Sequence, residues 1–455
     1  MTGPTRRVHV VTWGCQMNVY DSGKMTALLA LDGWEPVGSP DEADLVLFNT
    51  CSVRAKPEHK LNSFLGRMKG RKGRLLAVAG CTAQIDGVRI FRDHPEVDLV
   101  MGPDAVPRIR ELVHRAAHQR VLDTRCEEPT DHRFVPDLPP DAAGRVAALV
   151  TIQKGCDRHC TYCIVPRARG SEVSRPAAEV IDEVRRLVEV GARDITLLGQ
   201  NVDAYGKKTP GEPDFADLLH QVHSVPGLLR LRFTTSHPKD LSTRVIEAFR
   251  VLPRLAGALH LPVQSGSDRV LRRMGRGYTR DDYARRVSAL RAARPGLSLT
   301  TDFITGFPGE TEADFEDTLS LLEQIRFDGS FSFVYSRRPG TAAAHLHDRD
   351  PVDPARAHAR LLRLQAAQAR ISAEALEALV GREMEVLVEG PSRHGDGSVT
   401  GRTSCFRTVN LPGGPDLVGR LVPVRIVHSA PHSLVGRTVL EGGRGEEARP
   451  GRPAP

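Results

Sequence analysis

The sequence predicts an α/β protein of three domains: an N-terminal open parallel sheet, a partial (β/α)6 barrel and a small C-terminal antiparallel β-barrel. Three observations predict it. Short apolar runs alternate with amphipathic ones over the first 120 residues or so, six more such units follow Arg145, and the last part changes to short strands with Gly and Pro turns. A chain of 455 residues is long enough for two or three domains of roughly 150 residues each.

The N-terminal domain is expected over residues 6–121. Apolar runs separated by amphipathic segments predict buried parallel strands with helices between them. The four runs are "VHVVTWGC", "DLVLFNTC", "RLLAVAGC" and "VDLVMG". Over residues 125–144 this periodicity disappears and Pro and acidic residues accumulate, which indicates a linker.

The second domain is expected over residues 142–372. Its strand candidates are "VAALVTI", "DITLLG", "LRLRFTT", "GALHLPV", "LSLTTDFI" and "SFSFVY", most of them followed by a helix. A complete eight-unit barrel takes about 250 residues, so six units predict a wall that is open on one side. Such an opening could admit a large substrate.

The third domain is expected over residues 375–441, after a long helix that begins near Pro354. Its strand candidates are "MEVLVEG", "GSVTGRTSCFRTVNL", "LVPVRIVHSA" and "LVGRTVL". Their length and turns are typical of a small antiparallel barrel. The tail, residues 442–455, is polar and rich in Gly and Pro, so we expect it to be disordered.

Composition narrows the class of protein. Hydrophobic residues make up 40% of the chain, and no apolar stretch approaches the roughly 20 residues needed to span a bilayer. We therefore expect a cytoplasmic protein without a membrane segment. The net charge of +7 permits a polyanionic partner such as a nucleic acid without requiring one.

Three of the eight cysteines, Cys156, Cys160 and Cys163, lie close together in "KGCDRHCTYC". In a reducing compartment metal ligation is a more probable use of clustered thiols than a disulfide. Zinc and a [4Fe–4S] cluster both usually take four ligands, and the local sequence offers three thiols. His159 could be a fourth zinc ligand only with strain, whereas a three-cysteine cluster leaves one iron free to bind a small molecule.

Three further cysteines, Cys15, Cys51 and Cys81, each follow a predicted parallel strand directly. The carboxyl ends of parallel strands lie at one edge of a sheet, where ligands bind. One cysteine at a strand end is often just a small buried hydrophobe. Three in succession predict a second three-thiolate cluster.

The first trio, its spacing Cys-x3-Cys-x2-Cys, the aromatic Tyr162 before its last cysteine, and its place after the first barrel strand resemble the radical S-adenosylmethionine (SAM) enzymes. The resemblance implies that a [4Fe–4S] cluster on Cys156, Cys160 and Cys163 binds SAM and reductively cleaves it to a 5′-deoxyadenosyl radical. Tyr162 would lie beside the cofactor.

Two cysteine trios, one ahead of the barrel and one within it, resemble the methylthiotransferases over nearly the whole chain. The strings that carry this resemblance are "TWGCQMN", "NTCSVR", "KGCDRHCTYCIVPRARG" and "GRTSCFRTVN". They are most similar to the branch that makes 2-methylthio-N6-isopentenyladenosine in tRNA, and the small barrel looks like the RNA-binding TRAM domain. The resemblance implies two [4Fe–4S] clusters, one SAM as methyl donor and another as radical source, a tRNA partner, a flavodoxin- or ferredoxin-type electron donor, and a monomer.

The same resemblance suggests cofactor contacts after the second, fourth and fifth barrel strands. They are Gln200, Asn201, Gln264, Ser265, Gly306 and Phe307. Local structure is the alternative explanation in each case, because turns and helix caps favour the same residue types. Ser267 is expected to cap a helix, and Thr311 with Asp314 to form a capping pair.

Four arginines are candidates for anion contacts, because guanidinium makes bidentate bonds to carboxylates and phosphates. Arg167 and Arg169 could hold either anion, although they could equally be solvated charges. Arg402 and Arg407 are expected to contact RNA phosphates. Cys126 and Cys405 have no partner at metal-binding spacing and receive no function.

Two other functions stay open at this point. One is methylthiolation of threonylcarbamoyladenosine or of a ribosomal-protein side chain. The other is a non-catalytic RNA-binding protein with structural metal sites, which the sequence disfavours because both trios lack a nearby fourth ligand.

Overall fold

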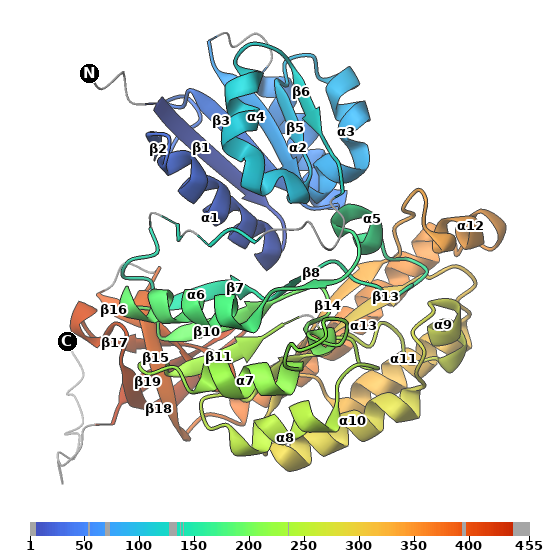
Figure 1. Ribbon diagram of the computed structural model, residues 1–455. Helices are drawn as coiled ribbons and strands as arrows, with labels where there is room; N and C mark the ends of the chain where they lie inside the picture. Colours follow the sequence, from blue (N-terminus) through green and yellow to red (C-terminus); the bar gives the residue numbers. More distant parts are fainter. Residues whose placement is uncertain are drawn as a thin grey trace, which may run out of the picture. The chain divides into compact units, whose positions relative to one another are not determined.

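A computed structural model describes residues 6–52, 55–68, 73–126, 134–136, 138–139, 141–234, 236–393 and 397–439, except for the side chains of 55–59 (Figure 1). The chain forms two compact units, Met1–Ser372 and Ala373–Pro455. The tail expected to be disordered lies outside the described residues, as does part of the expected linker. No helix in the described part of the chain combines the length and the apolar character needed to cross a membrane.

The first unit begins with a six-stranded sheet in which every neighbouring pair is parallel, as predicted. In spatial order its strands are β2 (Trp34–Pro36), β1 (Arg6–Trp13), β3 (Leu45–Thr50), β4 (Leu75–Gly80), β5 (Leu99–Met101) and β6 (Val121–Asp123). The central strand β3 is buried at all six positions, which agrees with the apolar run at 45–48, and its last two residues, Asn49 and Thr50, are polar. The short edge strands β2 and β6 were not among the predicted strands.

Helices cover both faces of this sheet (Figure 1). They are α1 (Gln16–Ala30), α2 (Ala55–Met68), α3 (Cys81–Asp93), the 3-10 turn η1 (Pro103–Arg108) and α4 (Ile109–Ala116). One apolar core joins the sheet to α1 and α4, and a second joins it to α2 and α3. Two separate cores fix the sheet from both sides and so fix the level at which its strands end.

The rest of the first unit contains all six predicted barrel strands, in two parallel three-stranded sheets ordered β11-β10-β7 and β12-β13-β14. The strands are β7 (Ala147–Thr151), β10 (Asp194–Leu198), β11 (Arg230–Phe233), β12 (Ala258–His260), β13 (Ser298–Thr305) and β14 (Gly329–Val334). In the described part of the chain, no ladder of hydrogen bonds joins β7 to β14. Among the same residues no ladder joins β11 to β12 either, where a single bridge pairs Leu231 with Leu255, so the wall has two breaks in its hydrogen bonding.

An outer layer of helices packs on these strands around one large core (Figure 1). The longer helices are α6 (Ala177–Glu189), α7 (Phe215–His223), α8 (Thr243–Val251), α10 (Arg280–Ala293), α11 (Glu312–Ile325) and α13 (Pro354–Glu377). Shorter elements stand at the strand ends: β8 (Gln153–Lys154), α5 (Val165–Arg169), β9 (Val173–Ser174), η2 (Val202–Ala204), α9 (Asp268–Arg273) and α12 (Ala342–Arg349). The two predicted caps are confirmed, because Ser267 caps α9 and Thr311 forms a capping box with Asp314 on α11.

The second unit carries a closed five-stranded barrel in the order β15-β16-β17-β19-β18. Its elements are β15 (Glu383–Pro391), β16 (Ser398–Thr403), β17 (Thr408–Pro412), the turn η3 (Pro415–Leu417), β18 (Leu421–Ala430) and β19 (Ser433–Thr438). The pairs are antiparallel except β17 with β19, which is parallel and closes the barrel. Closure leaves no edge strand exposed.

Candidate metal centres

The N-terminal sheet brings Cys15, Cys51 and Cys81 together. Strands β1, β3 and β4 are consecutive neighbours, and their last residues are paired in register, Trp13 with Thr50 and Thr50 with Gly80. Each cysteine follows within two residues of these ends. Cys15 is the N-cap of α1 and Cys81 the first residue of α3, so two of the three sulfurs stand at helix N-termini, where the dipole favours a thiolate.

Two asparagines fix this edge of the sheet. Asn18 Oδ1 accepts a hydrogen bond from the backbone N–H of Cys15 at 3.3 Å, and Asn18 Nδ2 donates to Asn49 Oδ1 at 2.9 Å. Asn49 Nδ2 donates back to the Asn18 carbonyl at 2.8 Å. Both asparagines are fully buried. Sequence reasoning missed them, although "GCQMN" and "NTC" place an Asn near Cys15 and near Cys51.

The pKa values of Cys15 and Cys81 are shifted in opposite directions. A hydrogen bond from Cys51 lowers the pKa of Cys15 to about 6, and the charge of Arg169 acts in the same direction. Burial raises the pKa of Cys81, while Arg169 opposes that rise. The Nε atom of Arg169 lies 3.3 Å from the Cys81 sulfur. Arg169 therefore reaches the first trio from α5, just after the second trio in sequence.

The second trio lies in the loop between β8 and α5. The backbone N–H of Cys156 donates to the Gly170 carbonyl at 3.3 Å, which closes the base of this loop. Gly155 has φ +71°, and a Cβ there would lie 2.0 Å from the Ser171 carbonyl oxygen, so only glycine fits. Burial raises the pKa of Cys156 to about 11 and that of Cys163 to about 12. Buried thiols of this kind ionise when a metal supplies the compensating charge.

Two further side chains contact the middle cysteine of this trio. Arg276 Nη1 donates to the Cys160 sulfur at 3.3 Å, and His237 Nε2 lies 3.9 Å from it. Burial lowers the pKa of His237 to about 3, so this ring is neutral at pH 7. Both residues lie far from Cys160 in sequence and no motif marked them.

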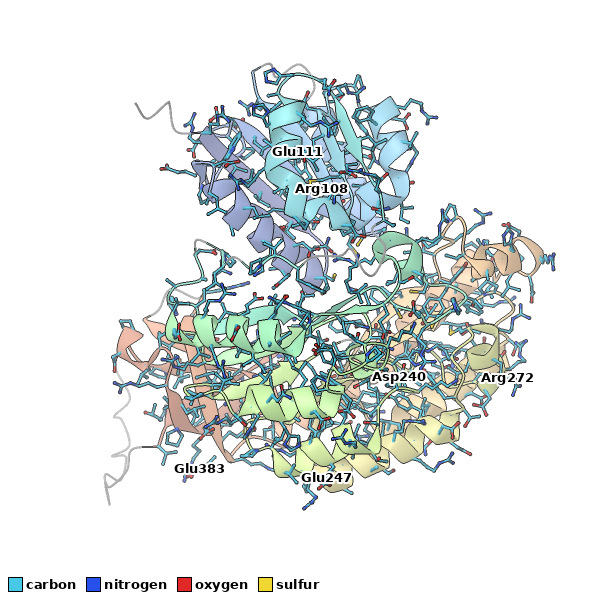
Figure 2. All side chains as sticks on the ribbon, in the orientation of Figure 1. Arg108, Glu111, Asp240, Glu247, Arg272 and Glu383 are labelled. Atoms are coloured by element: carbon cyan, nitrogen blue, oxygen red, sulfur yellow. The ribbon has the colours of Figure 1, made fainter. Side chains whose placement is uncertain are left out.

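A carboxylate at the barrel mouth organises the same region. Asp240, labelled in Figure 2, accepts hydrogen bonds from Arg158 Nε at 2.7 Å and from Asn201 Nδ2 at 2.8 Å. Although burial works in the other direction, hydrogen bonds from Arg158 and Asn201 hold the pKa of Asp240 at about 2. Arg158 belongs to the cysteine loop, so Asp240 ties this loop to the residues that follow β10.

The predicted cofactor residues differ in how many hydrogen bonds their side chains already make within the protein. Asn201 is buried and its amide is bonded to Asp240 and to the backbone N–H of His237. The Ser265 hydroxyl contacts Thr318 Oγ1 at 3.2 Å and accepts from the N–H of Ser267. The Oε1 atom of Gln200 is buried without a hydrogen-bond partner among the described residues. Of these three side chains, Gln200 is the one that still needs a polar partner.

The remaining predicted cofactor residues shape the backbone and the wall. Gln264, four residues after the end of β12, has φ +76°, a strained conformation for a residue with a side chain. A Cβ on Gly306 would lie 2.4 Å from that of Ala357, so packing against α13 requires this glycine. Phe307 is fully buried with its ring 6.5 Å from that of Tyr162. Phe307 therefore packs against the ring of Tyr162.

Unpartnered polar atoms show what the sites could hold. Thr50 Oγ1, Ser52 Oγ and Thr82 Oγ1 flank Cys51 and Cys81, are buried and have no hydrogen-bond partner among the described residues; the same holds for Gln153 Nε2 at the barrel mouth. Such groups cost free energy unless a ligand, ion or water meets them. No three His, Cys, Asp or Glu side chains of the described residues form a site for one metal ion. A [4Fe–4S] cluster has a different requirement, because here each thiolate would bind a different iron and the three sulfurs need not meet at one ion. The residues fit clusters at the trios and a polar cofactor at the barrel mouth.

The other predicted residues are placed as follows. Arg167 donates to the Pro339 carbonyl at 2.8 Å and is largely exposed. In the small barrel, Arg402 pairs with Glu389 at 3.2 Å and lies 4.2 Å from the centre of the Phe406 ring. The backbone N–H of Arg407 donates to Thr403 Oγ1. Cys126 and Cys405 contact Gln84 and Thr403 respectively.

Comparison with known families gives three matches along the chain. The Radical SAM superfamily matches residues 150–322, the Uncharacterized protein family UPF0004 matches residues 7–102, and the TRAM domain matches residues 377–439. The tRNA-2-methylthio-N(6)-dimethylallyladenosine synthase of Geobacter metallireducens is 48% identical over 97% of this chain and 100% of its own length. That of Anaeromyxobacter dehalogenans is 50% identical over 95% of this chain and 94% of its own length.

Solved structures agree at the level of the fold. The radical S-adenosylmethionine methyltransferase TsrM from Kitasatospora setae has a TM-score of 0.54 and 14% identity, covering 75% of this chain and 74% of its own. The cobalamin-dependent S-adenosylmethionine radical enzyme OxsB has a TM-score of 0.52 and 13% identity, covering 76% of this chain and 55% of its own. Identities this low show the fold alone.

The barrel, its cysteine loop and these matches define a radical SAM enzyme with a C-terminal TRAM domain. Enzymes of this class use SAM and a [4Fe–4S] cluster. More narrowly, the chain belongs to the family of the tRNA-2-methylthio-N(6)-dimethylallyladenosine synthases, which are methylthiotransferases.

Proposed function

We propose that this enzyme methylthiolates C2 of N6-isopentenyladenosine next to the anticodon in tRNA. It would use two SAM molecules, one as methyl donor and one as radical source, and two [4Fe–4S] clusters. The observation that carries the proposal is the presence of two separate cysteine trios, both at strand ends of one compact unit. The names of the relatives support the choice of substrate.

The clusters and SAM would supply the radical and the sulfur transfer, since side-chain acids and bases cannot activate an aromatic C–H bond. The chain's own residues bind and position. Cys156, Cys160 and Cys163 would hold the radical cluster, and Cys15, Cys51 and Cys81 the second cluster. Around SAM we place the residues expected from the sequence, Tyr162, Gln200, Asn201, Gln264, Ser265, Gly306 and Phe307. Gln153, whose Nε2 has no hydrogen-bond partner among the described residues, is an addition from the structure.

Asn201 would act on SAM through its neighbours as well as directly. Its amide is already bonded to Asp240, which also pairs with Arg158 in the cysteine loop and with Lys207. This chain of hydrogen bonds joins the end of β10 to the radical trio. Asn201 therefore orients the loop that carries Cys156 and Cys160, whatever else it contacts.

We further propose that the enzyme acts in the cytoplasm as a monomer, with an electron donor of the flavodoxin or ferredoxin type. The TRAM domain would hold the tRNA backbone while the open side of the barrel admits the modified adenosine. RNA recognition favours bases that can be splayed out of the stack, as in an anticodon loop.

The substrate is tested by nucleoside mass spectrometry of tRNA from a strain that lacks the gene. Isopentenyladenosine should accumulate while its methylthio derivative vanishes, and complementation should restore the derivative. Loss of a methylthio group from threonylcarbamoyladenosine or from a ribosomal protein, with normal isopentenyladenosine, would assign one of the alternative substrates instead.

Metal content tests the cofactor assignment. Anaerobically reconstituted protein should hold about eight iron and eight sulfide ions per chain, because each cluster contributes four of each. Inductively coupled plasma mass spectrometry and sulfide assay measure both. A content of about four irons per chain would contradict the presence of a second cluster. One or two zinc ions with little iron would favour the non-catalytic alternative.

The exposed aromatic of the small barrel gives a test of RNA binding. Phe406 is 45% exposed, has φ +65° and carries the Arg402 guanidinium over its ring. An exposed ring backed by arginine is suited to stacking a base, worth about 1–3 kcal/mol. Phe406→Ala should therefore weaken tRNA binding roughly 5- to 150-fold in fluorescence anisotropy. The control Val427→Ala, at a site 42% exposed in the same barrel, should bind as wild type.

A further inference from the structure

Each cysteine trio is contacted by one buried arginine. Arg169 Nε lies 3.3 Å from the Cys81 sulfur, and Arg276 Nη1 lies 3.3 Å from the Cys160 sulfur. Arg169 is 6% exposed and Arg276 is 5% exposed. A guanidinium cannot lose its proton in a protein, so both sites hold a fixed positive charge out of contact with water.

The other contacts of the two arginines differ in charge. Arg169 donates to Asp21 Oδ2 at 2.7 Å, which offsets part of its charge. Arg276 donates to the Tyr278 hydroxyl at 2.9 Å and to the Pro262 carbonyl at 2.8 Å, both neutral groups. The first trio therefore faces a compensated arginine and the second faces one whose described hydrogen-bond partners, apart from Cys160, are neutral.

Backbone structure places Arg169 with little freedom. It is the last residue of α5, and the next residue, Gly170, accepts the hydrogen bond that closes the loop of Cys156. Helix α5 packs against α3, whose first residue is Cys81. Arg169, which follows the loop of Cys156, Cys160 and Cys163, therefore places its positive charge beside Cys81 of the other trio.

We propose that Arg169 is a positioning residue that raises the reduction potential of the cluster on Cys15, Cys51 and Cys81, and that Asp21 limits the rise. Arg276 acts in the same way on the cluster held by Cys160 and its neighbours. The proposal rests on the proposed function, because it needs a second cluster. Reduction adds negative charge to a cluster and its sulfurs, and hydrogen bonds to those sulfurs are among the factors that set the potential. In a site of low dielectric constant, a nearby cation stabilises the reduced form most.

The experiment isolates each cluster in the full-length protein. The variant Cys156→Ala/Cys160→Ala/Cys163→Ala keeps only the N-terminal trio, and Cys15→Ala/Cys51→Ala/Cys81→Ala keeps only the other. Both are reconstituted anaerobically, and their midpoint potentials are measured by redox titration followed by electron paramagnetic resonance. Iron content and circular dichroism are recorded for every variant.

Arg169→Gln should lower the potential of the N-terminal cluster by at least a tenfold change in its reduction equilibrium, about 59 mV for one electron. Asp21→Asn should raise that potential. Neither change should move the potential of the second cluster, which Arg276→Gln should lower. The crossed pattern separates a local effect of each arginine from a general effect on folding.

Loss of Arg169 alone leaves Asp21 buried without its ion-pair partner, so Arg169→Gln/Asp21→Asn provides a second variant of matched charge. It should bind iron as its parent does and still show the lower potential. A normal iron content with an unchanged potential would overturn the inference alone. Absence of iron from the parent that keeps Cys15, Cys51 and Cys81 would overturn the second cluster, and with it both the proposed function and this inference.

Discussion

Cys160→Ala is expected to abolish reductive cleavage of SAM, whereas Cys51→Ala should retain cleavage and lose methylthio transfer. The two cysteines belong to different trios, one at the barrel mouth and one at the edge of the N-terminal sheet. Cleavage needs the iron that binds SAM, while sulfur insertion needs the second cluster as well. Each variant should keep roughly half the iron, about four ions per chain. Liquid chromatography of 5′-deoxyadenosine and of the modified nucleoside measures both reactions.

Cys126→Ala is the matched control, since this cysteine contacts Gln84 and belongs to neither trio. It should resemble the wild type in iron content and in both reactions. If Cys51→Ala abolished cleavage while its circular dichroism stayed that of the wild type, the two trios would not divide the chemistry in this way.

Much of this architecture follows from local sequence. Six runs of alternating or mostly apolar residues predicted the six barrel strands, because side chains from most of these strands fill one large core. The convergence of Cys15, Cys51 and Cys81 followed from a rule about parallel sheets and did not require their partners to be known. The edge strands β2 and β6 were missed because they are short and only partly buried, with the patterns Trp-Glu-Pro and Val-Leu-Asp, whereas β5 is equally short but wholly apolar and buried.

The arginines that contact the cysteine sulfurs could not be predicted in the same way. Arg169 and Cys81 are 88 residues apart, and Arg276 and Cys160 are 116 apart. No periodicity connects such pairs, because packing of separate elements brings them together. From the sequence, Arg169 could equally hold a carboxylate or phosphate or be a solvated charge; in the structure it is buried against the Asp21 carboxylate and a cysteine sulfur.

The polar residues at strand ends show a related difficulty. Asn201 and Ser265 were expected to contact the cofactor, and both make hydrogen bonds within the protein that explain their burial. A side chain that orients a loop and one that binds a ligand need the same chemistry. Sequence alone therefore places these residues at the strand ends near the site, but it does not distinguish a residue that orients a loop from one that binds a ligand.

Gly80→Ala is expected to remove the N-terminal cluster while leaving the radical cluster in place. Gly80 ends β4 directly before Cys81, with φ +91° and ψ −161°, a conformation that is essentially restricted to glycine and costs other residues about 1–3 kcal/mol. A Cβ at this position would lie 2.3 Å from Asn49 Oδ1 and 2.7 Å from the Thr50 carbonyl oxygen. Asn49 holds Asn18 beneath Cys15, and Thr50 directly precedes Cys51, so one methyl group disturbs the supports of all three cysteines.

Gly33→Ala separates this local clash from backbone strain in general. Gly33 also has a positive φ, +77°, but a Cβ there would have no atom within 4 Å. It should lose stability by about 1–2 kcal/mol in chemical denaturation and keep the iron content of the wild type. Gly80→Ala should fall to about four irons per chain and lose methylthio transfer with SAM cleavage intact. A Gly80→Ala protein with full iron content would show that the asparagine pair yields to the methyl group and that the sheet edge is more adaptable than its contacts indicate.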